Sequence, residues 1–245
     1  MIYKALLLFL PAFTAGISMS MLRMPATFLR LLLAFSGAFL LSVTLTHVLP
    51  EVFEADHHWA GLWLLIGFCL QIVIDMFSKG LEHGHVHLHH HEGQHHHHGP
   101  AKAAIPMVSL GLFVHGLLEG LPLFSVKSIE DPLLWGIVLH SIPVAAVYAG
   151  LLRKHALGLW KRWFLIAAFC LMAPVGMALG AWQTEGHEQL KTVFMGLTAG
   201  VFLHISTTIL FESAHEHQYK LRRLLAILAG MAAGALGIWF GHAHA

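Results

Sequence analysis

Eight apolar segments, each long enough to cross a lipid bilayer, constrain this chain more than any other feature of its sequence. They fall near residues 2–22, 30–50, 60–79, 104–125, 132–152, 163–182, 191–213 and 221–240. Inside a bilayer the backbone can satisfy its hydrogen bonds only in helices or closed barrels, and runs of this length predict helices. Only 11% of the residues are charged, against about 25% in soluble domains. The sequence therefore predicts an all-α, polytopic membrane protein with eight transmembrane helices.

The distribution of basic residues predicts the orientation of these helices. Of the 14 Lys and Arg residues, 11 lie on one side of the predicted helices: Arg23, Arg30, Lys79, Lys102, Arg153, Lys154, Lys161, Arg162, Lys220, Arg222 and Arg223. Only Lys4, Lys127 and Lys191 lie on the other side. By the positive-inside rule the first side is cytoplasmic, so we expect a plasma (inner) membrane protein with both termini outside the cytoplasm. The net charge of +1 gives no indication of nucleic-acid binding.

Histidine is unusually frequent, and 10 of the 22 histidines lie between His83 and His98. Segment 82–100 has low complexity, so we expect a disordered cytoplasmic loop between the third and fourth helices of a single transmembrane domain, 1–245. Neutral imidazoles at this density bind Zn²⁺ loosely. An expression tag is the alternative, but tags lie at termini. The predicted loose ligands are His85, His87, His89, His90 and His91.

The strongest indication of a site lies in segment 113–124. His115 and Glu119 are four residues apart and share one face of a helix. A carboxylate near the bilayer centre costs roughly 2.5–3.5 kcal/mol, so an intramembrane Glu predicts a functional site. The next helix carries His140 beside Pro143, where we expect the proline to break the helix. Two His and one Glu are typical ligands for Zn²⁺, and Fe²⁺ or Mn²⁺ can also use them.

Further polar residues extend along the helices on both sides of this predicted site. His47 and Glu51 share a face near the outer end of the second helix and form a candidate entrance for metal, although an ordinary interfacial helix end explains them equally well. His204, Glu212 and Asp75 lie toward the cytoplasmic end and form a candidate exit. A hydrogen-bonded core residue is the alternative for His204. Together these residues predict a ladder of nitrogen and oxygen ligands across the bilayer.

Several motifs resemble those of the ZIP (Zrt-, Irt-like) family of metal transporters. H-G-L-L-E-G at 115–120 resembles the family signature H-x-x-x-E-G, and H-S-I-P at 140–143 resembles the start of its fifth-helix motif. Further matches are H-V-L-P-E in the second helix, A-P-V-G-M-A-L-G in the sixth and G-V-F-L in the seventh. The resemblance spans the whole chain. It implies transport of divalent metal, most often zinc, into the cytoplasm through a 3+2+3 inverted-repeat bundle whose fourth and fifth helices form the central pair.

The chain departs from the family at the position of a second metal ion. Many members have a carboxylate from the fifth helix that bridges two adjacent ions, and here that position is Val144. Gly116 and Ser141 stand where the family usually has further ligands. We therefore expect one tightly bound ion, with His115, Glu119 and His140 as its ligands.

Two other classes of protein also place His and Glu in a bilayer or carry His-rich loops. A membrane-embedded zinc hydrolase activates water at such a site, but the His-rich loop and the polar ladder have no role in hydrolysis. A cation-diffusion exporter has His-rich cytoplasmic loops, but that resemblance predicts fewer helices. We expect a transporter rather than an enzyme. Because the chain has no nucleotide-binding motif, we expect a secondary transporter driven by the metal gradient or a coupled ion. Its partners are then the metal ion and the lipid bilayer, and a homodimer is left open together with the metal selectivity and the coupling ion.

Overall fold

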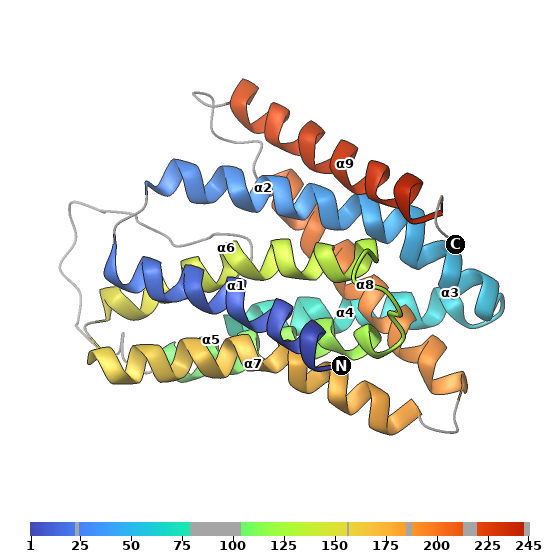
Figure 1. Ribbon diagram of the computed structural model, residues 1–245, viewed down its shortest axis with the longest axis horizontal. Coiled ribbons are helices and arrows are strands. Elements are labelled where there is room, and N and C mark those ends of the chain that lie inside the picture. Colours follow the sequence, from blue (N-terminus) through green and yellow to red (C-terminus); the bar gives the residue numbers. More distant parts are fainter. Residues whose placement is uncertain (23–24, 79–103, 156, 185–187, 213–219, 243–245) are drawn as a thin grey trace.

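The computed structural model describes residues 1–22, 25–78, 104–155, 157–184, 188–212 and 220–242, and every regular element in these ranges is helical (Figure 1). The α-helices are α1 (Ile2–Met21), α2 (Ala26–Val43), α3 (Leu49–Ala55), α4 (Ala60–Ser78), α5 (Ala104–Gly120), α6 (Pro132–Lys154), α7 (Leu159–Thr184), α8 (Glu188–Glu212) and α9 (Lys220–His242). A π-helical turn, η1 (Thr44–Val48), joins α2 to α3, and a 3₁₀ turn, η4 (Leu121–Phe124), follows α5.

Seven segments in the described ranges are long and apolar enough to cross a membrane. They are α1, α2 together with η1 and α3, α4, α5 together with η4, α6, α7 and α8. The eighth long helix, α9, has 23 residues and packs along α2 (Figure 1). The prediction of an all-α, multi-pass membrane protein is confirmed.

Pro122 and Pro143, the prolines that follow His115 and His140, have different effects on their helices. α5 ends at Gly120, and Pro122 lies in the 3₁₀ turn that follows. The expected break at Pro143 is wrong, because α6 continues through this residue. A proline removes only one backbone hydrogen bond and its ring strains one turn. Pro143 and its neighbours Ser141 and Val144 are buried, so packing around this turn holds the helix together across it.

One end of the bundle gathers basic residues from the last turn of α6 and the first turn of α7. We call it the basic end. There Arg153 Nη1 donates to the carbonyl oxygens of Met19 and Leu22 at 3.2 and 2.8 Å. Arg162 Nη1 donates to the carbonyl oxygen of Ser20 at 3.2 Å. These guanidinium groups satisfy the carbonyls at the C-terminus of α1 and complement its helix dipole.

The opposite end of the bundle holds Lys4 and Lys191, two of the three basic residues that the sequence placed there. The buried Lys4 donates from Nζ to the carbonyl oxygen of Val126. Lys191 lies 3.8 Å from a carboxylate oxygen of Glu51. α1 begins and α9 ends at this end (Figure 1). Arg153, Lys154 and Arg162 thus lie at one end and Lys4 and Lys191 at the other, in line with the predicted division. The cytoplasmic assignment of the basic end remains a prediction.

The long helices pack in two groups. α1, α5, α6 and α7 make their largest contacts with one another, and we call them the site bundle. α2, α4, α8 and α9 form the companion bundle, which meets the site bundle mainly through α2 against α6 and α4 against α5. The most extensive pairs are α2 with α9, α4 with α8, α1 with α6 and α5 with α7. In an inverted repeat, the pair of α2 and α9 would correspond to the pair of α4 and α8, and the pair of α1 and α6 to the pair of α5 and α7. The repeat itself remains a prediction.

Glycines bring α5 and α7 into contact through their backbones. A Cβ atom at Gly176 would collide with the carbonyl of Leu117, and one at Gly120 would collide with the carbonyl of Ala173. In a membrane, helices associate through close packing of small residues, because lipid provides no hydrophobic driving force. These contacts therefore fix the position of α5 against α7.

Other glycines do the same within the companion bundle. A Cβ atom at Gly200 of α8 would collide with the carbonyl of Leu64 in α4. One at Gly230 of α9 would collide with the carbonyl of Phe35 in α2. Between the two bundles the contact at Gly136 of α6 is looser, since a Cβ atom there would meet side chains and no backbone, Leu40 at 3.2 Å and Phe39 at 3.7 Å. Close backbone contacts at glycines thus occur within each bundle, whereas at Gly136 the seam between the bundles is formed by side chains.

Candidate metal centre

Three predicted ligands converge where α5 lies against α6. His115 Nε2 lies 3.3 Å from Glu119 Oε1, one helical turn away on α5. His140 Nε2, from α6, lies 3.7 Å from the same oxygen. One donor atom from each residue can be chosen so that all lie within 4.8 Å of one another. Donors about 2.1 Å from a tetrahedral Zn²⁺ lie about 3.4 Å apart, so only a small contraction is needed for all of them to bind one ion.

The centre is sealed from solvent. The exposed fractions of the His115, Glu119 and His140 side chains are 1%, 2% and 0%. The two imidazole rings are 5.9 Å apart and nearly perpendicular, at 78°, so they approach the carboxylate from different directions. A buried carboxylate requires a compensating charge. A divalent cation bound by these donors would supply that charge.

A hydrogen bond from the companion bundle holds the backbone of α5 at this site. Pro122 has no N–H, so the carbonyl of Leu118, four residues earlier, lacks its helical donor. Thr198 Oγ1, from α8, donates to that carbonyl at 3.2 Å. This carbonyl directly precedes Glu119 in the chain, so the bond links the two bundles at the depth of the candidate centre.

Two of the three predicted exit residues meet in the companion bundle. His204 Nε2, on α8, lies 3.6 Å from Asp75 Oδ2, on α4. Gln71 Nε2 donates to the other carboxylate oxygen of Asp75 at 2.7 Å. The side chains of His204 and Asp75 are 12% and 17% exposed. The third predicted residue, Glu212, ends α8, and its side chain lies outside the part of the chain that the structure describes.

The two predicted entrance residues, His47 and Glu51, have different partners. His47 lies in the π-helical turn η1 and places Nε2 3.7 Å from Asp131 Oδ1. Asp131 is the N-cap of α6 and accepts a hydrogen bond from the backbone N–H of Leu133. Glu51 pairs instead with Lys191, and their side chains are 44% and 35% exposed. An ion pair this exposed contributes little to stability.

Tyr148 and Ser109 were missed by the sequence analysis. Their hydroxyl groups lie 2.6 Å apart, and both residues are buried between α6 and α5. Tyr148 is eight residues after His140, on the same face of α6 and nearer the basic end. That spacing is the signal that could have identified it.

Some predicted residues cannot be placed. The loose ligands of the His-rich loop, from His85 to His91, lie outside the described residues. Within the described residues, the only group of three or more His, Cys, Asp or Glu side chains spaced to hold a metal ion is that of His115, Glu119 and His140.

The structure is a multi-pass helical bundle that buries two imidazoles and one carboxylate at its centre. These are the ligand types of a divalent-metal site, so fold and site together define a membrane protein with a candidate metal centre in its core. Comparison with known families gives the particular group. Residues 79–236 match the family model described as ZIP zinc transporter, and the chain belongs to this family.

Curated relatives agree with this assignment. The mouse protein named zinc transporter ZIP2 is 29% identical over 152 residues, which cover 58% of this chain and 48% of the relative. The human protein of the same name is 26% identical over 166 residues, which cover 64% of this chain and 52% of the relative. The chain thus spans about half the length of the curated relatives it matches.

Proposed function

We propose that this protein is a secondary transporter, not an enzyme, which moves divalent metal cations into the cytoplasm, Zn²⁺ above all. The observation that carries the proposal is the convergence of His115, Glu119 and His140 in a sealed centre between α5 and α6. Membership of the ZIP zinc transporter family and the names of the curated relatives support the same function. Imidazole and carboxylate ligands suit Zn²⁺, and Fe²⁺ or Mn²⁺ are alternative substrates.

In this proposal the ion enters at the end of the bundle near His47 and Glu51 and binds at the candidate centre. It leaves past Asp75, His204 and Glu212 toward the basic end, which faces the cytoplasm. The donor groups of the centre belong to the site bundle, whereas Asp75 and His204 belong to the companion bundle. Transfer therefore requires the two bundles to shift along their seam, as in transporters that expose a midplane site to each side in turn.

The His-rich loop and the orientation complete the proposal. Segment 82–100 forms a cytoplasmic loop that collects metal at the inner end, and both termini lie outside the cytoplasm of a plasma (inner) membrane. The division of the basic side chains between the two ends supports this orientation.

Metal accumulation distinguishes the proposed function from its alternatives. We expect cells that express the protein to accumulate zinc faster than cells with an empty vector, as measured by mass spectrometry of washed cells. Lower zinc content would indicate an exporter, and unchanged content would favour a membrane-embedded hydrolase. Fe²⁺ and Mn²⁺ offered in the same assay establish the order of preference.

Asp75→Asn should reduce the rate of zinc uptake several-fold without weakening zinc binding at the candidate centre. The substitution removes the negative charge that faces His204 and Gln71 but keeps the size of the side chain. Uptake by cells and zinc binding to purified protein are measured side by side. Glu130→Gln, an exposed carboxylate beyond the other end of the bundle, is the matched control. Equal uptake in both variants would remove Asp75 from the proposed exit.

A further inference from the structure

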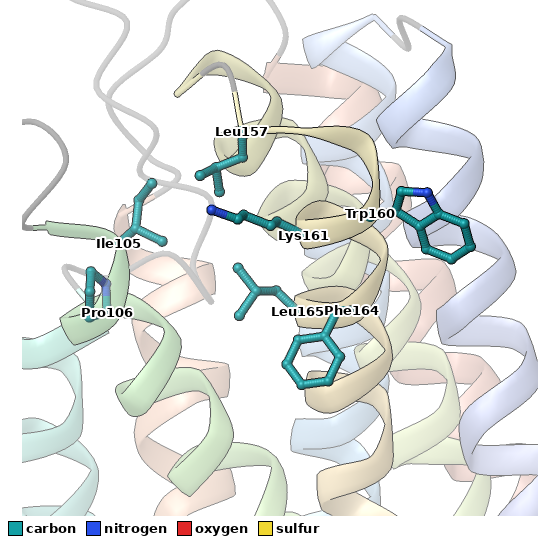
Figure 2. Close-up of a pocket in the computed structure, with 7 residues that line it drawn as sticks. All are labelled: Ile105, Pro106, Leu157, Trp160, Lys161, Phe164 and Leu165. Carbon is teal, nitrogen blue, oxygen red and sulfur yellow. The ribbon is translucent and has the colours of Figure 1, made fainter.

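A recess opens at the basic end between the first turns of α5 and α7. It has a volume of about 600 Å³ and is lined by Ile105 and Pro106 from α5 and by Leu157, Phe164 and Leu165 beside or within α7 (Figure 2). This volume lies within the usual range of small-molecule pockets, and the lining is mainly apolar, as such pockets usually are. The candidate metal centre contributes no residue to it.

The recess is bordered by exposed apolar side chains, as expected for a surface that faces the lipid of a bilayer. Phe164 is 73% exposed, and Trp160, at the edge of the recess, is 83% exposed. Tryptophan at the end of a membrane helix is typical of the level of the lipid headgroups. An acyl chain in the recess would therefore have its headgroup at the level of Trp160.

One charged side chain lies in this apolar lining. Lys161 extends from α7 toward α5, and its ammonium group ends between Leu157 and Ile105 (Figure 2). Its neighbour Arg162 donates to a carbonyl at the end of α1, as does Arg153. By contrast, no carboxylate in the described parts of the chain forms an ion pair with Lys161. Its positive charge is thus directed at a space that the described protein does not fill.

We propose that this recess binds one anionic phospholipid, with an acyl chain between α5 and α7 and the phosphate group at Lys161. An apolar recess with one cation at its edge matches an apolar chain that carries one anion at its end. Basic side chains at the membrane surface attract anionic lipids in this way. The bound lipid would contact the first turn of α5, the helix that carries His115 and Glu119.

Native mass spectrometry of the purified full-length protein tests the proposal by counting the lipids it retains. The protein in detergent is offered dioleoyl-phosphatidylglycerol, dioleoyl-phosphatidylcholine or soluble glycerol phosphate. We expect one tightly retained phosphatidylglycerol, weaker retention of phosphatidylcholine and no retention of glycerol phosphate. Lys161→Gln should reduce the preference for phosphatidylglycerol about fivefold, whereas Lys154→Gln, an exposed lysine that does not line the recess, should leave it unchanged.

A second variant tests the apolar half of the site. Leu165→Trp fills the recess and should reduce retention of both lipids, while zinc binding to the same sample reports an intact fold. The proposal is overturned if Lys161→Gln and Lys154→Gln behave alike, if glycerol phosphate binds as well as the lipid, or if the two lipids are retained equally. A dimer that excludes lipid would also overturn it, because a second copy of the chain would then cover the recess.

Discussion

Glu119→Gln is expected to reduce zinc uptake by about a hundredfold or more, with the protein still present in the membrane. Glu119 supplies the only carboxylate of the candidate centre, and its Oε1 faces both His115 and His140. Removing one partner of a buried charged set costs about 3–5 kcal/mol, because the remaining charge is left uncompensated. Glutamine keeps the shape of the side chain and removes its charge, so the loss would report electrostatics rather than packing.

His115→Ala and His140→Ala are expected to give losses of similar size, since each removes one donor from a set of three. Ser141→Ala is the matched control. Ser141 is adjacent to His140, but its hydroxyl donates to the carbonyl of Ile137 in its own helix at 2.8 Å. Initial rates of radioactive zinc uptake are divided by the amount of protein in the membrane fraction. Normal rates in two of the three ligand variants would show that the centre is not the transport site.

The second large effect concerns the number of ions at the centre. We expect the unmutated protein to bind one Zn²⁺ between α5 and α6, because Val144, one turn beyond His140, contributes no ligand. Val144 is fully buried in an apolar cluster that also contains Leu112 and Phe169. Two divalent ions a few ångströms apart repel each other strongly in such surroundings unless a carboxylate bridges them.

Val144→Glu should therefore admit a second ion or tighten the binding of the first. Val144→Gln is the control, because it has nearly the same size as glutamate and no charge. Cryo-electron microscopy in excess zinc, on protein that lacks segment 82–100, counts the ions directly. Two adjacent metal peaks in the unmutated protein would show that the single-ion prediction is wrong, and thermal unfolding with and without zinc shows whether the variants remain folded.

Features that depend on residues close together in the chain were predictable from the sequence. The apolar segments located the long helices to within a few residues, because the thickness of a bilayer sets their length. His115 and Glu119 were predicted to share a face because a helix repeats every 3.6 residues, and their donor atoms lie 3.3 Å apart. His140 was identified as the third member of the set because the next helix also places a histidine beside a proline, and the resemblance to a family pointed to the same residue.

Features that depend on how the helices pack were harder to predict from the sequence. Asp75 and His204 were both predicted as exit residues, but their contact joins helices that are far apart in the chain, and no local pattern in the sequence indicates such a pair. The break predicted at Pro143 did not occur, because tertiary packing outweighs the local cost of a proline. The partner of His47 was missed as well, although an aspartate directly before a proline is a recognisable helix start, as Asp131 shows.

The backbone contacts at the glycines and the side-chain contacts at the seam place different demands on the sequence. A single added methyl group at a glycine contact has no space to enter, so the interior of each bundle tolerates almost no change in volume there. At the seam around Gly136, where side chains make the contact, we expect a larger or smaller side chain to alter how firmly the bundles adhere. If the proposed shift of the two bundles carries the ion, substitutions at the seam are expected to change the rate of transport without changing the ligands His115, Glu119 and His140.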